Sequence, residues 1–176
     1  MRDKRIAPLL VAALATFIGT HQARAQTCFR ACIAQRVKGS DITDDMIRFQ
    51  MTTCRDDCEE ESRERRASLG IGRKLETCEP QAVSENEFKA VRSASASFLV
   101  YAHAFTWDIH NILPGKIIRK VEISYPTMDL DETTATGGGT VLPGETATIL
   151  INGVFDGYPA MHYALKVHAI YACPSG

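Results

Sequence analysis

The sequence has little net charge, few aromatic residues and no long apolar run beyond its first 25 residues. Its 20 Lys and Arg residues are balanced by 21 Asp and Glu residues, so the formal net charge is −1. That balance argues against the broadly basic surface with which proteins bind the phosphates of nucleic acids. Aromatic residues make up 7% of the chain, with one Trp among them. A length of 176 residues suits one domain, or one domain with a small appendage.

Motifs of the common catalytic classes are also absent from the sequence. It contains no G-x-S-x-G nucleophile elbow, no H-E-x-x-H metal motif, no phosphate-binding P-loop and no dinucleotide-binding fingerprint. The acidic residues Asp108, Glu122 and Glu145 stand singly and form no evident acid–base pair. His162 and His168 share one face of a predicted strand, but about 20 Å would separate them, too far to hold one ion. We therefore predict a non-enzymatic protein without a cofactor.

The first 25 residues have the three parts of a secretory signal peptide. A basic head over residues 1–5 precedes an apolar stretch over residues 6–19, and an A-x-A cleavage sequence ends at Ala25, before Gln26. The apolar stretch is shorter than the roughly 20 residues of a membrane span, which favours cleavage over anchoring. The segment holds four of the 20 basic and one of the 21 acidic residues, so the processed chain would have a net charge of −4. We expect a location in the periplasm or outside the cell, without a stable membrane span.

Six cysteines are the unusual feature of the composition. Cys28-x-x-x-Cys32 and Cys54-x-x-x-Cys58 each place two thiols one helical turn apart, on one helix face. The two pairs are nested in the sequence. An antiparallel helical hairpin that turns at residues 39–43 would therefore bring Cys28 opposite Cys58 and Cys32 opposite Cys54.

Cys78 and Cys173 lie near the two ends of the remaining chain, and the simplest pairing joins them. Six cysteines permit many connectivities, so geometry ranks these three pairs without proving them. An exported chain is expected to hold its cysteines as disulfides. Zinc binding by the four cysteines of the hairpin is the alternative, but the oxidising compartment and the usual, tighter spacing of zinc ligands count against it.

The twin C-x-x-x-C pattern over residues 28–58 resembles the α-hairpinin family of disulfide-stapled helix–loop–helix modules. The spacing between the two cysteine pairs is longer here than in the small plant inhibitors of that family. Members include protease inhibitors and antimicrobial peptides, so the resemblance implies that the hairpin can present a binding loop. The loop would contain Arg36 and Lys38, basic residues of the kind that a trypsin-like protease recognises. These two residues are our candidates for partner binding.

Apolar residues alternate with polar ones in the second half of the chain, which is typical of half-buried strands. The strands are predicted at residues 87–94, 98–109, 116–125, 145–155 and 161–171. Turn residues separate them, so an antiparallel sandwich or small barrel is expected. The acidic and Gly/Thr-rich residues 129–140 predict a flexible surface loop, with calcium binding as the alternative.

Trp107 on an early strand and Tyr163 on a late one resemble the layout of immunoglobulin and fibronectin III domains. Leu165 stands where antibody domains have their second cysteine, so the resemblance implies a sandwich without the inter-sheet disulfide. The predicted fold class is α+β, with a disulfide-stapled helical hairpin followed by an antiparallel immunoglobulin-like sandwich. Its predicted units are the hairpin at residues 26–66, a linker at residues 67–84 and the sandwich at residues 85–176.

These features predict an exported interaction protein, a binding or adaptor module whose partner is another envelope or extracellular protein. The hairpin would offer a rigid helical surface, and the sandwich an open edge for the addition of a strand. One alternative is an inhibitor of a hydrolase, either a protease or a cell-wall lytic enzyme. A second is a secreted enzyme whose site assembles from residues that are distant in the sequence.

Overall fold

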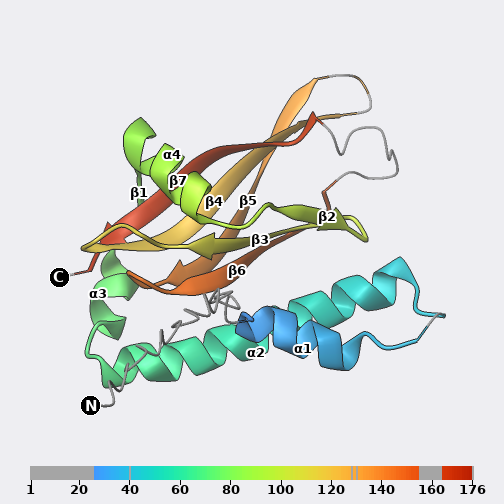
Figure 1. The fold of residues 1–176 in the computed structure, drawn as a ribbon, viewed down its shortest axis with the longest axis horizontal. Coiled ribbons are helices and arrows are strands. Elements are labelled where there is room, and N and C mark those ends of the chain that lie inside the picture. The colour runs from blue at the N-terminus through green and yellow to red at the C-terminus, as the bar shows by residue number, and fades with distance from the viewer. Residues whose placement is uncertain (1–25, 40, 128, 130, 155–163, 176) are drawn as a thin grey trace, which may run out of the picture.

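The protein is a three-layered α+β structure in the computed structural model, where a helical hairpin lies beneath two antiparallel sheets (Figure 1). The structure describes residues 26–39, 41–127, 129, 131–154 and 164–175. The expected helical segment with disulfides and the expected antiparallel sheets are therefore confirmed. The predicted signal peptide at residues 1–25 lies outside the described residues, as do His162 and Tyr163.

Two helices form the hairpin, α1 (Cys28–Arg36) and α2 (Asp44–Ser68). Each starts at a threonine cap, because the hydroxyls of Thr27 and Thr43 accept hydrogen bonds from backbone N–H groups three residues further on. The chain turns between the helices at the expected place, where Gly39 has a φ of 113°, a conformation that favours glycine.

Three disulfides brace the chain, and they join the pairs that the cysteine spacing favoured. The bonded pairs are Cys28–Cys58, Cys32–Cys54 and Cys78–Cys173. The first two fasten α1 to α2 with Cα–Cα distances of 5.9 and 5.7 Å. The third fastens the end of α3 (Gly72–Thr77) to β7 (Lys166–Pro174).

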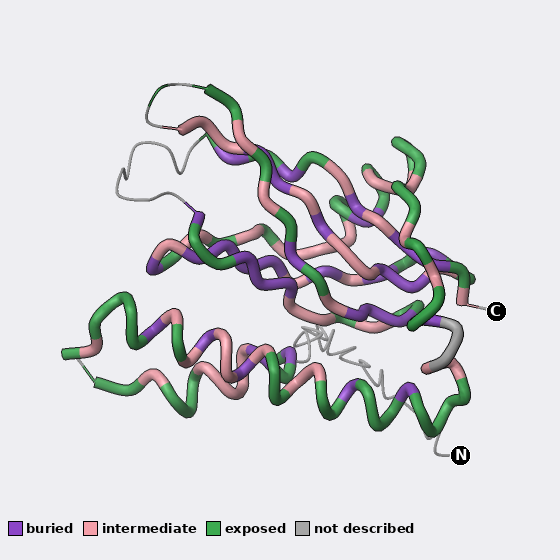
Figure 2. The backbone as a smooth tube through the Cα atoms, turned by 180° about the vertical axis from the view of Figure 1, so that it is seen from behind, coloured by how far each residue is buried: buried purple, intermediate pink, exposed green. Residues whose placement is uncertain are grey.

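The strands form a three-stranded and a four-stranded sheet, and every pair of neighbouring strands is antiparallel. The smaller sheet has the order β2 (Leu99–Tyr101), β3 (Ala104–His110) and β6 (Thr146–Asn152). The larger has the order β1 (Gln81–Ala82), β7, β4 (Lys116–Pro126) and β5 (Glu132–Val141). Their facing sides enclose the main core, which appears in Figure 2 as buried stretches of the strands. Trp107 is 1% exposed there, and its indole N–H donates to the carbonyl oxygen of Ala96 over 2.8 Å.

A second apolar cluster joins the hairpin to the outer face of the three-stranded sheet. Phe29, Ile47 and Met51 of the helices are buried in it together with Ala104 of β3 and Leu150 of β6. The alternation of β3 and β6 explains how this is possible, since neighbouring residues of a strand point to opposite faces. The hairpin therefore shares a buried interface with the sandwich.

The predicted edge strand at residues 87–94 is wrong, because this segment is the helix α4 (Glu85–Ala94). A capping box starts it: the Ser84 hydroxyl accepts from the Glu87 N–H, and the Glu87 carboxylate accepts from the Ser84 N–H over 2.9 Å. Val91 on the inner side of α4 is fully buried in the main core. The Ser-x-x-Glu sequence was a helix signal that competed with the short alternating pattern.

The predicted single strand at residues 98–109 is two strands, β2 and β3, with a tight turn between them. Ala102 and His103 form the turn with φ values of 50° and 57°, which residues other than glycine seldom adopt. Asp44 and Arg48 of α2 approach this turn, since Arg48 donates to the carbonyl oxygen of Ala102 over 3.3 Å and Asp44 lies 3.8 Å from the imidazole of His103. The helix therefore supports a turn for which the sequence has no turn signal such as glycine.

The predicted loop at residues 129–140 is wrong over most of its length, because β5 begins at Glu132. The region predicted as a linker contains α3 and β1, and α3 covers a small cluster that includes Leu75 and Ile117. In the part of the chain that the structure describes, no helix is both long and apolar enough to cross a membrane.

Candidate binding groove

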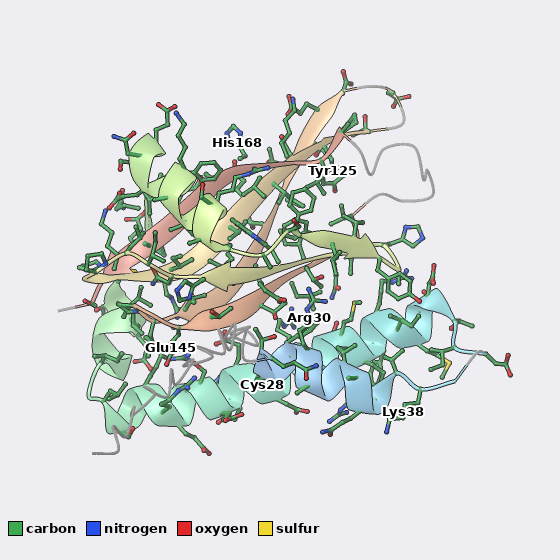
Figure 3. All side chains as sticks on the ribbon, viewed as in Figure 1. Cys28, Arg30, Lys38, Tyr125, Glu145 and His168 are labelled. Atoms are coloured by element: carbon green, nitrogen blue, oxygen red, sulfur yellow. A yellow bond between two sulfur atoms is a disulfide. The ribbon has the colours of Figure 1, made fainter. Side chains whose placement is uncertain are left out.

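A groove of about 910 Å³ lies between the hairpin and the sandwich. Its floor is the outer face of β3 and β6, one wall is the second half of α2, and one end is the start of α1. Among the described residues, α1 begins at Cys28 and covers one part of the outer sheet face, and the groove lies over the adjoining part. Figure 3 shows Arg30 and Glu145 on opposite sides of this region.

Asp108 is the centre of a polar network where α1 meets the floor. Its carboxylate accepts from Nε of Arg30 at 3.1 and 3.2 Å and from the hydroxyl of Thr148 at 2.6 Å. Arg30 also donates to the hydroxyl of Thr106 over 3.2 Å. The hydroxyls of Thr148 and Thr27 lie 2.7 Å apart, so the cap of α1 belongs to the same network. These bonds fasten the start of the helix to the sheet.

His110 continues the floor beyond this network. Its Nδ1 lies 3.0 Å from the hydroxyl of Thr146 on the neighbouring strand, and its backbone N–H donates to the hydroxyl of Ser95. An imidazole beside a hydroxyl is half of a nucleophile–base arrangement. The third group of such an arrangement orients the imidazole, but Asp108, two residues earlier on the same face, binds Arg30 and Thr148 instead.

Glu59 anchors the wall of the groove to the four-stranded sheet. Its carboxylate accepts from the backbone N–H of Thr140 in β5 over 3.0 Å and lies 3.5 Å from the guanidinium of Arg66. Arg66 is buried and also donates to the hydroxyl of Ser62 over 2.7 Å. Arg119 of β4 bonds to the Thr140 hydroxyl. Burial lowers the pKa of Arg119, and the positive charge of Arg66 lowers it further.

Hydroxyl groups of the floor and the wall give the groove its chemical character. Thr27, Ser62, Thr140, Thr146 and Thr148 all contribute to its lining. Each of these hydroxyls already has a hydrogen-bond partner within the protein, and a hydroxyl oxygen has room to accept a further bond. Several of the charged groups beside them are already paired, as Arg30 is with Asp108 and Arg65 with Glu145 at 3.5 Å. Such a surface fits an uncharged polar ligand, for example the backbone of an extended peptide.

The candidate partner-binding residues Arg36 and Lys38 lie outside this groove, at the end of the hairpin. Arg36 ends α1, and its guanidinium pairs with Asp57 of α2 over 2.7 Å. Lys38 is exposed in the turn. Figure 3 shows Lys38 at one end of the hairpin, and Glu145 of the sandwich above the other end. The structure thus brings the six cysteines together in pairs, but it does not bring Arg36 and Lys38 to the groove.

A second polar cluster occupies the outer face of the four-stranded sheet. The hydroxyl of Tyr171 donates to Glu122 over 2.9 Å, and this bond raises the pKa of the tyrosine. The ammonium group of Lys120 lies 4.0 Å from the centre of the Tyr171 ring, and Nε2 of His168 lies 3.8 Å from Glu122. No group of three or more His, Cys, Asp or Glu residues suited to a metal ion occurs among the residues that the structure describes.

Exposed apolar residues lie in pairs at two further places. Leu99 and Tyr101 of β2 are more than half exposed, and β2 is an edge strand of its sheet. Met46 and Phe49, one helical turn apart near the start of α2, are exposed to a similar degree. The open edge expected from the sequence is therefore present at β2, although that strand has three residues.

Alternation alone could have placed Thr106, Asp108 and His110 together on the outer face of one strand. No local signal could have shown that Thr146 and Thr148 lie beside them, since this depends on the pairing of β3 with β6.

In comparisons with known proteins, no family model, curated protein or solved structure matches the chain.

Proposed function

We propose that this is an exported, non-enzymatic interaction protein that binds an extended segment of another envelope or extracellular protein in the groove. The observation that carries the proposal is the half-covered outer face of β3 and β6, lined by hydroxyls and paired charges. The proposal includes processing after Ala25, a location in the periplasm or outside the cell, and an α-hairpinin-like hairpin on an immunoglobulin-like sandwich. Three disulfides support the location, because they persist in oxidising compartments.

Rigidity of the groove supports a binding role. The first two disulfides hold the helices that form its wall and its end, and Glu59 and Arg30 bond these helices to the sheets. A surface that is ordered before its partner arrives loses less conformational entropy on binding. The groove volume lies within the range of about 300–1,000 Å³ for ligand pockets, which suits a short segment of a partner chain.

Site-specific photo-crosslinking in the envelope fraction tests this proposal. A photoreactive residue at Thr146, on the floor of the groove, is expected to yield a discrete adduct with one partner. The same residue at Glu60, which is exposed on α2 and does not line the groove, is the matched control and is expected to yield none. Adding His110→Trp, which fills the groove, should suppress the adduct. Equal labelling from both positions, or no adduct from Thr146, would contradict groove binding.

A second candidate function is inhibition of a hydrolase, a protease or a cell-wall lytic enzyme, by the hairpin turn. The specific observation in its favour is the exposed Lys38 at a turn that two disulfides hold from behind. Arg36 is engaged by Asp57, so Lys38 would make the main contact with a trypsin-like protease. Lys38→Ala should then abolish inhibition, whereas Arg63→Ala on the exposed side of α2 should preserve it. An inhibition constant unchanged by Lys38→Ala would exclude the turn.

A secreted enzyme is the third candidate, and the imidazole–hydroxyl pair of His110 and Thr146 is its one specific support. It predicts hydrolysis of an ester or amide substrate by the purified protein, lost in Thr146→Ala and in His110→Ala. Activity that survives both substitutions would place any catalytic site elsewhere.

A further inference from the structure

We propose that the processed protein carries a modified N-terminus, in which Gln26 has cyclised to pyroglutamate at the end of the groove. This inference rests on the proposed export, because only cleavage after Ala25 makes Gln26 the first residue. It adds a modification site to that proposal, and its test separates the two.

Cleavage after Ala25 would turn the backbone nitrogen of Gln26 into an α-amino group at an exposed position. Gln26 precedes the cap of α1 and lines the groove. The helix does not depend on it, since the first turn is closed by bonds to the carbonyl and hydroxyl oxygens of Thr27 from Ala31 and Arg30. Cleavage before Gln26 would therefore leave α1 and its cap intact.

The reaction needs no group beyond Gln26 itself. The uncharged α-amino nitrogen attacks Cδ of the side-chain amide, the bond from Cδ to the amide nitrogen breaks, and one molecule of ammonia leaves. A five-membered lactam results, and the positive charge of the N-terminus is lost. No electrons are transferred between reactants, so neither an oxidant nor a reductant is required.

The partial charge at the start of α1 favours the cyclic form. The N-terminal end of a helix has a partial positive charge, which an ammonium group one residue before the cap would oppose. No acidic residue lies in the first turn of α1 to offset it, and Arg30, in that turn, is already paired with Asp108. A neutral lactam removes this repulsion and leaves two amide groups at the end of the groove.

Thr27 holds the reacting residue in place relative to the sheet. It is 7% exposed and its hydroxyl lies 2.7 Å from that of Thr148, so the chain is tied down directly after Gln26. The lactam would therefore lie at a defined end of the groove, where an uncharged N-terminus matches the uncharged polar ligand inferred above.

Intact mass spectrometry and N-terminal sequencing of the exported, disulfide-bonded protein test the inference. After prolonged incubation at neutral pH, we expect the mass of residues 26–176 less one ammonia and a blocked N-terminus. Pyroglutamyl peptidase should remove the blocked residue from the unfolded chain, so that sequencing then starts at Thr27. Gln26→Asn is the matched control, because its shorter side chain cannot close the five-membered ring, and it should give the full mass and a readable sequence.

The possible outcomes distinguish the two proposals. A chain that starts at Gln26, retains the side-chain amide and gives a readable N-terminal sequence would overturn the cyclisation. The proposal of export would still stand. A chain that starts elsewhere, or that still includes residues 1–25, would overturn the proposed processing and with it the basis for the modification.

Discussion

At the scale of single residues, Glu59 has a structural role in the groove, because its carboxylate contacts both a strand and its own helix. It accepts from β5 and lies beside the buried Arg66 of its own helix. We predict that Glu59→Gln destabilises the protein by about 1–2 kcal/mol, since it leaves a buried guanidinium without its anion while part of the site remains open to water. Urea unfolding at neutral pH measures the change.

The matched control for this substitution is Glu60→Gln on the neighbouring position of α2. Glu60 pairs with Arg63 over 2.6 Å, but both side chains are more than half exposed. Exposed pairs contribute little because water screens them, so the control should cost about 0.5 kcal/mol or less. Equal losses from the two substitutions would show that Glu59 is an ordinary surface charge.

Glu87 predicts a pH dependence at the start of α4. Its ion pair with Lys116 at 2.6 Å, together with hydrogen bonds from Ser84, lowers its pKa from 4.5 to about 2. A carboxyl whose pKa falls on folding contributes stability above its unfolded pKa and loses it as the pH drops toward the folded pKa. The stability advantage over Glu87→Gln should therefore be constant above pH 5 and shrink between about pH 4.5 and 2.

Urea midpoints of both proteins across that pH range provide the measurement. Glu85→Gln is the control, because Glu85 pairs with Lys89 on the exposed side of the same helix. We expect its difference from the unsubstituted protein to remain small throughout. An advantage over Glu87→Gln that persists unchanged to pH 2 would contradict the assigned cause.

At the scale of elements, sequence patterns identified structures that are determined locally and missed those that depend on distant contacts. The spacing of Cys28 to Cys58 is a local pattern that predicted both helices of the hairpin and its nested disulfides. The turn at Ala102 was not predictable, because its unusual backbone is supported by Arg48, more than 50 residues away. The strand β5 was not predicted for the same reason, since Gly137 and Gly139 allow close contact with β6 of the other sheet.

Gly137 and Gly138 provide a test of this explanation in one strand. A Cβ atom at Gly137 would lie 2.6 Å from Cγ1 of Ile151 and 2.7 Å from the carbonyl oxygen of Leu150, so β6 would have to move. A Cβ at Gly138 would be 3.9 Å from its nearest neighbour, the carbonyl oxygen of Arg119. We predict that Gly137→Ala costs about 1–3 kcal/mol, as overpacking of a core does.

The control substitution, Gly138→Ala, should leave the free energy of unfolding unchanged or raise it slightly, because alanine restricts the unfolded chain more than glycine does. Chemical unfolding of the two variants under identical conditions gives the comparison. If both substitutions were tolerated equally, the close approach of β5 to β6 would not be the reason for glycine in this segment.

At the scale of the whole molecule, the groove is a product of assembly that no single segment specifies. Asp108 could be placed on the outer face of a strand from alternation, but its partners Arg30 and Thr148 come from another element and another strand. The sequence therefore predicted which residues face outward and could not predict which of them the hairpin covers. The candidate site lies where the hairpin stops covering the outer face of β3 and β6.

The shared cluster of Phe29, Met51 and Leu150 also predicts how the molecule unfolds. The sequence suggested a hairpin at residues 26–66 and a sandwich at residues 85–176 as separate units, whereas their joint burial implies that they lose structure together. Circular dichroism of the helices reports mainly on the hairpin, whose α2 has 25 residues against 6 in α3 and 10 in α4. Fluorescence of the single Trp107 reports on the core of the sandwich. We predict coincident urea transitions for the two signals, which is the mark of a two-state unit.

Phe29→Ala makes this prediction sharper, because the substitution is in the hairpin and the fluorescent reporter is not. Phe29 is 3% exposed and packs in the shared cluster, so its truncation should cost about 3 kcal/mol. If the hairpin and sandwich unfold as one unit, the Trp107 transition moves to lower urea by the same amount as the helical transition. Phe49→Ala, at a position 67% exposed on α2, should move neither signal appreciably. A helical transition that shifts while the Trp107 transition stays in place would show that the hairpin is an independent module, attached to the sandwich without stabilising it.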